Sequence, residues 1–201
     1  MRLDLSGVRE HAASTVEDAA RQAAVVAPVI DRDGVDHVLF TKRADHLGEH
    51  PGQMAFPGGG REPSDADLTE TALREANEEI GLRATEAEVI GRLDDIETVS
   101  EYSIRPFVAR VPDRAYEPDE REVAEIAVLS VPDLTDLANY ESERRDHSHY
   151  GEIRIHFFHV DGYTVWGATG RMLVQLLELT TDWRMPAEVD RVVDPDADLP
   201  R

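Results

Sequence analysis

Short apolar runs separated by polar turns dominate the first half of the chain, and this pattern predicts strands. An apolar run over 21–30 is followed by a turn at Asp33 and Gly34 and by a second run over 35–41, which predicts a β-hairpin. Pro28 predicts a sheet edge or a break in the first run, because proline lacks a backbone donor. Further strands are predicted near residues 88–97, 104–111, 122–131 and 153–160.

Residues 67–81 carry the clearest helical pattern. Asp67 with Glu70 three residues later is a capping box, and Gly81 suits the left-handed position that ends a helix. One apolar stripe runs along this predicted helix, made by Thr69, Leu73, Ala76 and Ile80, with Ala72 at its edge. The helix is therefore expected to bury this stripe and to turn its acidic residues the other way.

The later segments predict two more helices around a charged loop. Pro132 opens a short helix that is expected to end near residue 138. Residues 139–152 are charged and rich in His and Arg, and we expect a mobile loop there. A closing helix is predicted over 169–179, with its inward side formed by Leu173, Leu176 and Leu177.

The length of 201 residues predicts one domain with two extensions. We expect a polar, helical N-terminal extension over 1–20 and a main domain over 21–182. The acidic segment 183–201 contains several prolines and is a candidate for disorder. Mixed strands and helices without regular βαβ alternation predict the α/β class with a mixed sheet.

Composition excludes several classes of site. The chain has no cysteine, which excludes disulfides, thiolate metal sites and a cysteine nucleophile. It has no apolar stretch of eighteen residues and no apolar signal region at its start, so we expect a cytoplasmic protein without a membrane partner. The histidines show no convincing metal-ligand spacing.

The charge balance is strongly acidic. Asp and Glu number 42 against 21 basic residues, giving a formal charge of −21, which repels phosphate backbones and argues against nucleic acid as a partner. Lys42 is the only lysine. This composition predicts a halophilic protein from a salt-rich cytoplasm, because ions screen the self-repulsion of the chain. An ordinary soluble acidic protein is the alternative.

Three glutamates share one side of the predicted helix over 67–81. Glu75, Glu78 and Glu79 stand at i, i+3 and i+4, which makes them neighbours on a helix surface. Three like charges this close repel one another unless a cation neutralises them, and an oxygen-only set favours a hard ion such as Mg²⁺. The alternative is the solvated acidic face of an ordinary amphipathic helix.

The segment from Gly59 to Leu82 resembles the Nudix box. The matching residues are Gly59, Arg74, Glu75, Ala76, Glu78, Glu79, Gly81 and Leu82. Asp65 stands where the box has a Glu, and the gap from Asp65 to Arg74 is one residue longer than usual. The resemblance implies an α/β/α sandwich with a mixed β-sheet and hydrolysis of a diphosphate with Mg²⁺, for which Mn²⁺ could substitute.

Residues 39–59 are similar to the coenzyme A pyrophosphatase branch of that family. The shared motifs are Thr41-Lys42-Arg43, His50-x-Gly52-Gln53 and Phe56-Pro57-Gly58-Gly59. Gly48 departs from the branch, because an Arg often stands there. The resemblance covers roughly residues 22–180 and implies cleavage of coenzyme A, or an acyl or oxidised form, into 3′,5′-adenosine bisphosphate and 4′-phosphopantetheine.

The resemblance also implies roles for the acidic residues. Glu75, Glu78 and Glu79 are the implied catalytic metal ligands, and Arg74 is implied to hold one of them in place. Glu122 is our first choice for a further ligand from outside the helix. Its competitors are Glu120, Glu101 and Glu97. Which carboxylate accepts the proton of the attacking water stays open.

Substrate contacts are expected from the residues around the glycine turn. Lys42 and Arg43 are placed to meet phosphates, and His50 and Gln53 to meet the pantetheine or ribose-phosphate part. Phe56 is a candidate apolar wall, with a place in the core as the alternative, because an aromatic residue beside a glycine turn is more often core. The glycine positions expected to let backbone amides approach a phosphate are Gly59 and Gly60.

Two other functions stay open at this point. One is a Nudix hydrolase of another nucleoside diphosphate derivative, such as ADP-ribose, NADH or a damaged nucleotide. The other is a Nudix-fold nucleotide-binding module without turnover. The sequence also leaves open the acyl preference, the oligomeric state, with a homodimer as one option, and whether residues 139–152 close over the substrate.

Overall fold

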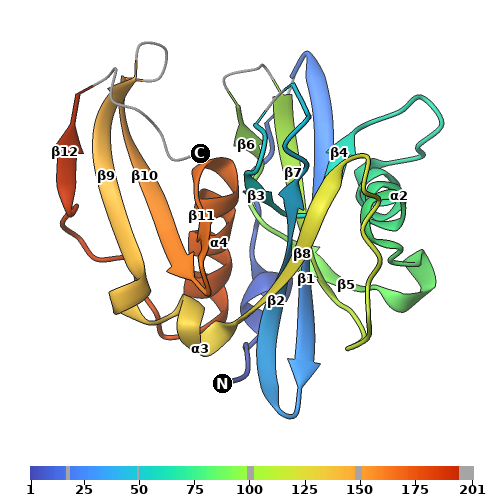
Figure 1. Ribbon diagram of the computed structural model, residues 1–201, viewed down its shortest axis with the longest axis horizontal. Coiled ribbons are helices and arrows are strands. Elements are labelled where there is room, and N and C mark those ends of the chain that lie inside the picture. Colours follow the sequence, from blue (N-terminus) through green and yellow to red (C-terminus); the bar gives the residue numbers. More distant parts are fainter. Residues whose placement is uncertain (17–18, 49, 99–101, 148–150, 195–201) are drawn as a thin grey trace.

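Two β-sheets form the scaffold of the computed structural model, which describes residues 1–16, 19–48, 50–98, 102–147 and 151–194. A mixed eight-stranded sheet lies at the centre, and a four-stranded sheet stands beside it (Figure 1). The strands of the main sheet follow the order β3-β2-β1-β7-β5, with β4 on β1, β6 on β7 and β8 on β2. Their bounds are β1 Arg21–Arg32, β2 Val35–Arg43, β3 Met54–Ala55, β4 Gly58–Gly60, β5 Glu88–Arg92, β6 Ile96–Glu97, β7 Tyr102–Arg110 and β8 Val123–Ser130.

The predicted hairpin is confirmed, but the expectation from Pro28 is wrong. β1 pairs antiparallel with β2 and runs unbroken between β2 and the parallel strand β7. On its β2 side, β1 pairs with β4 over Ala23–Val25 and with β2 from Val29 onward. Pro28 lies just before the β2 pairing begins, so the ladder on that side tolerates a residue without a donor.

Helix α2 (Leu68–Ile80) begins and ends as its sequence predicts. The Asp67 side chain accepts from the Glu70 amide at 2.9 Å, and Gly81 closes the helix with a φ of 66°. Its apolar face differs from the expected stripe, because Leu68 and Ala72 are more buried than Thr69 and Leu73. The prediction that all three glutamates turn away from the buried face is also wrong for Glu79, which is only 6% exposed.

The main sheet is covered on both faces, which confirms the α/β/α sandwich (Figure 1). Strand β1 alternates between the two cores: Ala24 and Val26 pack with α2, whereas Val25 and Ala27 pack in the core shared with α4 (Gly167–Thr180). The inward leucines predicted for α4 are buried. None of the helices in the described parts of the chain has the length and apolar character needed to cross a bilayer.

The second sheet corrects two expectations. Its strands are β9 Tyr140–His147, β10 Gly151–Val160, β11 Tyr163–Val165 and β12 Arg191–Val193, in the order β11-β10-β9-β12. The charged segment predicted as a mobile loop over 139–152 is therefore mostly strand, and its residues 148–150 lie outside the described residues. The segment 183–194 is ordered too, because Trp183 is buried and β12 pairs with β9.

The N-terminal extension is mostly not helical. Of the described residues up to 20, only α1 (Ser6–Glu10) forms a helix. Beyond it, the Asp94 carboxylate accepts from the Ser14 amide at 2.8 Å and lies 2.9 Å from His11 Nε2. These side-chain contacts replace helical hydrogen bonds and tie the extension to the main domain. The remaining short helices are η1 Ala84–Glu86, α3 Val131–Leu134 and η2 Leu137–Asn139.

Candidate active site

The glycine turn of β4 lies between β1 and helix α2. Gly58, Gly59 and Gly60 pair with residues 25, 24 and 23 of β1. A Cβ on Gly58 would lie 2.3 Å from the Ala24 carbonyl oxygen, so this position requires glycine. The absence of side chains lets two carboxylates of α2 reach the turn.

Glu79 and Glu75 approach neighbouring glycines. The Gly58 amide donates to Glu79 Oε2 at 3.1 Å. A Cβ added to Gly59 would lie 2.6 Å from Glu75 Oε2, which means that this carboxylate lies directly over Gly59. Each carboxylate therefore lies against one residue of β4, Glu79 against Gly58 and Glu75 against Gly59. The spacing of these residues in the sequence did not predict this arrangement.

The electrostatics of these acids show that they lie close together. The pKa of Glu79 is raised to about 8, mainly by burial and also by the nearby charges of Glu75 and Glu122, while the Gly58 amide and Arg43 oppose the shift. Burial also raises the pKa of Glu75, against the opposing effect of Arg74. Carboxyl groups with raised pKa values bind protons more readily. A divalent cation bound among them would neutralise their negative charges in place of those protons.

Arg74 organises the group, as predicted, and Asp65 holds Arg74. The Arg74 guanidinium donates to Glu75 Oε1 at 3.0 Å, to Glu78 Oε2 at 3.2 Å and to the Gly60 carbonyl at 3.0 Å. Asp65 accepts from Arg74 Nε at 3.0 Å, and this contact holds the pKa of the carboxyl well below its usual range. Asp65, the residue that departs from the usual box, therefore holds the Arg74 side chain in place.

Glu122 reaches the group from the turn before β8. The Asp119 amide in this turn donates to the Glu79 carbonyl at 2.8 Å, and the Glu122 carbonyl accepts from the Ala44 amide at 2.9 Å. These contacts fix Glu122 between α2 and the end of β2. Glu122 is exposed, as are its competitors Glu97 and Glu120, so the contacts of its turn and its effect on the pKa of Glu79 favour it, and Glu101 lies outside the described residues.

The donor set fits a hard cation. Within the described residues, no three acidic or histidine side chains already converge on a point that could hold an ion. Glu78 is the most exposed of the three helix glutamates, with 58% of its side chain accessible, and it is turned toward Arg74. The carboxylates of Glu75, Glu78 and Glu79 offer oxygen donors alone, a chemistry that suits Mg²⁺ better than softer metals.

A pocket of about 680 Å³ gathers three of the predicted substrate residues. Lys42, His50 and Gln53 line it, together with Trp166, which sequence reasoning did not assign to the site. Arg43 differs from its neighbour, because successive side chains of a strand point to opposite faces. The charge of Arg43 lowers the pKa of Glu79 from the α2 side of the sheet. Of the two adjacent cations, Lys42 therefore lies at the pocket and Arg43 at the acidic group.

Phe56 is a correction to the predicted site. It is 2% exposed, and its ring stacks on Phe40 with 5.0 Å between the ring centroids. It therefore belongs to the core behind the glycine turn and does not form an accessible wall for a substrate. An aromatic residue next to a turn gives no sequence signal that separates these two roles.

Comparison with known proteins gives one consistent family. A sequence profile described as NUDIX domain matches residues 20–150. An uncharacterized Nudix hydrolase NudL of Enterobacter sp. (strain 638) is 37% identical over 160 residues, covering 78% of this chain and 81% of that protein. A protein of the same description from Yersinia enterocolitica is 33% identical over 163 residues, covering 79% and 81%. Among solved structures, a C. elegans Ap4A hydrolase aligns with a TM-score of 0.48 and 17% identity, over 59% of this chain and 86% of that one.

Proposed function

The chain belongs to the Nudix family as a hydrolase of pyrophosphate bonds, and we propose that its substrate is coenzyme A or an acyl or oxidised derivative. The products of this reaction are 3′,5′-adenosine bisphosphate and 4′-phosphopantetheine, or the acyl form of the latter. The proposal rests on the chain's own substrate pocket, since fold alone does not fix the substrate.

One observation carries the proposal: Lys42, His50 and Gln53 line a single pocket. They come from the segment that is similar to the coenzyme A pyrophosphatase branch, and the pocket volume of about 680 Å³ suits a small organic molecule. The pocket begins one residue from Arg43, whose charge acts on Glu79. A bound molecule could therefore reach from this pocket to the acidic group.

We propose Mg²⁺ as the ion, with Mn²⁺ as a substitute, since Nudix hydrolases generally use a divalent metal. Glu75, Glu78, Glu79 and Glu122 would hold it. When bound, the ion neutralises diphosphate oxygens and lowers the pKa of a water molecule. Burial raises the pKa of Glu75 and Glu79, and the neighbouring carboxylates raise it as well; this closeness of the carboxylates supports the assignment.

The residues of the chain supply positioning and proton transfer. Arg43, beside the acidic group, and Lys42, in the pocket at the end of the same strand, are the cations for the substrate phosphates, and Arg74 keeps Glu75 over the glycine turn. The water oxygen forms a bond to one phosphorus, and the bridging P–O bond breaks with its electrons leaving on the other phosphate. A carboxylate of the acidic group takes the proton from the water.

A substrate panel tests the proposal. Coenzyme A, acetyl-coenzyme A, ADP-ribose and NADH are compared with Mg²⁺ and with Mn²⁺ in molar KCl, and the products are identified by mass spectrometry. We expect the highest kcat/KM for the coenzyme A class, with release of 3′,5′-adenosine bisphosphate. Faster cleavage of ADP-ribose or NADH would assign another diphosphate substrate, and tight binding without any cleavage would indicate a binding module.

A further inference from the structure

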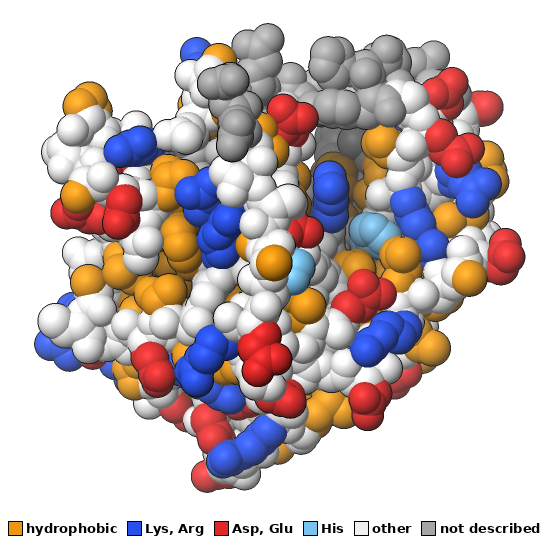
Figure 2. All heavy atoms as spheres, turned by 180° about the vertical axis from the view of Figure 1, so that it is seen from behind, with side chains coloured by type: hydrophobic (Ala, Val, Ile, Leu, Met, Phe, Trp, Pro, Cys, Tyr) orange, Lys and Arg blue, Asp and Glu red, His pale blue; other side chains and the backbone are white. Residues whose placement is uncertain are grey.

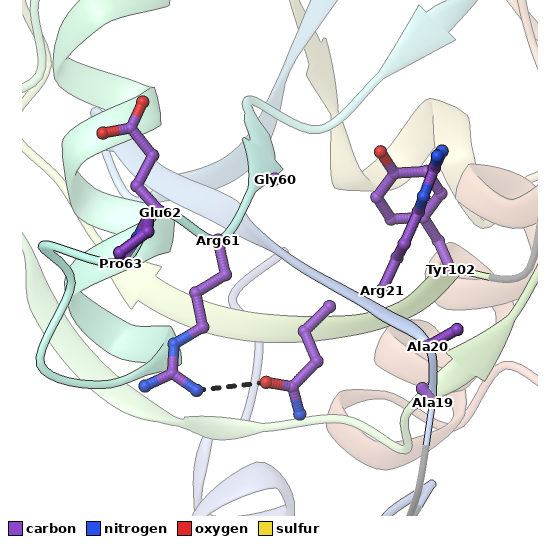
Figure 3. Close-up of a pocket in the computed structure, with 9 residues that line it drawn as sticks. Ala19, Ala20, Arg21, Gly60, Arg61, Glu62, Pro63 and Tyr102 are labelled. Carbon is purple, nitrogen blue, oxygen red and sulfur yellow. Dashed lines mark hydrogen bonds between the residues drawn. The ribbon is translucent and has the colours of Figure 1, made fainter.

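A second pocket, of about 460 Å³, opens at the other end of the glycine turn (Figure 3). Gly60 borders it, along with Arg21 of β1, Tyr102 of β7 and Arg61. The residue pattern of the sequence indicated no role for Arg21, Tyr102 or Arg61. The position of the pocket is informative, because Gly60 directly follows the two glycines that contact Glu79 and Glu75.

Arg21 is the available cation of this pocket. Its guanidinium lies 5.4 Å from the centre of the Tyr102 ring, a cation–π contact across paired positions of β1 and β7. Arg61 is held by Gln22 Oε1 at 3.1 Å and points away from Arg21 (Figure 3). Glu62 also lines the pocket, and its carboxylate points away from Arg61.

Arg21 belongs to the minority of described arginines that form no ion pair. Acidic residues outnumber basic ones two to one, 42 against 21, and most described arginines form ion pairs with them. Within the described ranges, Arg21 forms no ion pair with any carboxylate and is exposed. A guanidinium beside an aromatic ring, next to a diphosphate-cleaving group, is a surface suited to a phosphorylated purine nucleoside.

We propose that this pocket binds the 3′-phosphorylated adenosine arm of the substrate, with Arg21 binding the 3′-phosphate and the purine packing beside Tyr102. The assignment rests on the proposed function, because coenzyme A carries this phosphate whereas ADP-ribose and NADH do not. It divides the substrate around the glycine turn. The diphosphate lies at the acidic group, the adenosine arm lies beyond Gly60, and the uncharged pantetheine arm lies toward Gln53.

Equilibrium binding of two nucleotides tests the assignment without turnover. Titration calorimetry with Mg²⁺ compares 3′,5′-adenosine bisphosphate with 5′-AMP, which lacks only the 3′-phosphate, on the intact chain. We expect Arg21→Ala to weaken binding of the bisphosphate roughly tenfold and binding of AMP by less than about threefold, since it removes a charge-assisted contact to the 3′-phosphate. Arg21→Lys should restore part of the difference.

Arg9→Ala is the matched control, because Arg9 lies in α1, is exposed and has no ion pair among the described residues. It should bind both nucleotides as the unaltered chain does. Equal weakening of both nucleotides by Arg21→Ala, or no preference for the bisphosphate in the unaltered chain, would overturn the assignment. A chain that shows the expected binding difference yet never cleaves coenzyme A would support Arg21 and refute the proposed reaction.

Discussion

Gly59 and Glu75 fit together so closely that one added methyl group tests the site. A Cβ at Gly59 would lie 2.6 Å from the Glu75 carboxylate, and that carboxylate is the far end of a flexible side chain. We therefore expect Gly59→Ala to displace Glu75 without unfolding the protein. Turnover should fall by about a hundredfold, since a misplaced ligand disturbs the reacting geometry, and calorimetric unfolding should change little.

Gly48→Ala is the matched control, because a Cβ there meets no atom within 4 Å. It should leave both turnover and unfolding near those of the unaltered chain. If Gly59→Ala retained full turnover, the contact between Glu75 and the glycine turn would have no part in the reaction.

His156 predicts a pH dependence of stability. It is 7% exposed, its Nδ1 lies 2.8 Å from Tyr140 Oη, and burial lowers its pKa from 6.5 to about 4. Between these values the unfolded chain binds the proton and the folded chain does not, so stability falls as the pH falls from about 6.5 to about 4. The expected loss is about 3 kcal/mol in the free energy of unfolding.

Urea unfolding of the unaltered chain and of His156→Gln, at matched high KCl, measures this contribution. The difference between the two pH profiles isolates His156 from the many carboxylates that titrate over the same range. Parallel profiles for the two proteins from pH 7 to pH 4 would show that His156 does not resist protonation.

Single residues show where sequence reasoning succeeds. The spacing of Glu75, Glu78 and Glu79 predicted a shared helix side, because helical periodicity depends on the local chain alone. The burial of Glu79 was not predictable, since it follows from the packing of the glycine turn against α2. The role of Asp65 was not predictable either, because the folded conformation of the loop brings Asp65 next to Arg74.

The segment between β2 and β3 forms a closed loop, and its residues line the proposed substrate pocket. The Arg43 amide donates to the Gln53 carbonyl at 3.0 Å, and the Gly52 amide donates to the Arg43 carbonyl at 3.1 Å. The Gln53 amide group also lies close to Gly167 at the start of α4, where an added Cβ would meet it at 3.2 Å. The loop therefore presents Gln53 between the strand end and α4.

Gln53→Ala should raise KM for coenzyme A more than KM for a diphosphate that lacks the pantetheine arm. The reason is that, in the proposed binding mode, the lost amide contacts the arm and not the reacting phosphates. We expect a rise of about tenfold for coenzyme A, the size of one neutral hydrogen bond. Steady-state kinetics with both substrates measures the difference, and equal rises would remove Gln53 from a role in specificity.

At the scale of elements, most of the first half of the chain and strand β10 were predictable, whereas β9 and β12 of the second sheet were not. Neighbouring strands such as β1 and β2 carry apolar runs that reveal them. Strand β9 is charged, and its buried Glu143 and Arg145 are stabilised by pairing with each other at 2.7 Å. Glu143 also pairs with Arg191 of β12, far away in the sequence, so local composition resembled that of a loop.

The whole molecule has a formal net charge of −21, and many of its charged side chains form ion pairs. Figure 2 shows acidic and basic side chains interspersed over one face, without a large patch of one sign. Pairs such as Asp36 with Arg110 and Asp95 with Arg105 join acids that are buried to partly exposed arginines. The excess of unpaired acids still repels across the surface.

We expect the melting temperature to rise when KCl is increased from near zero to molar concentration. Added ions shorten the screening length from tens of ångströms to about 3 Å and so weaken the repulsion between surface acids. Scanning calorimetry over a KCl series, with sucrose as a control for an uncharged solute, measures the effect. Equal stability near zero salt and in molar KCl would refute adaptation to a salt-rich interior.

The most direct test of the account is the rate of coenzyme A hydrolysis against Mg²⁺ concentration, for the unaltered chain and for Glu79→Gln. We expect a rate that saturates with Mg²⁺ and falls by about a hundredfold or more in the variant, because a proposed ligand of the ion is lost. Glu10→Gln, in exposed α1, should match the unaltered chain. Near-normal turnover in Glu79→Gln, or no cleavage by the unaltered chain at any Mg²⁺ concentration, would contradict the account.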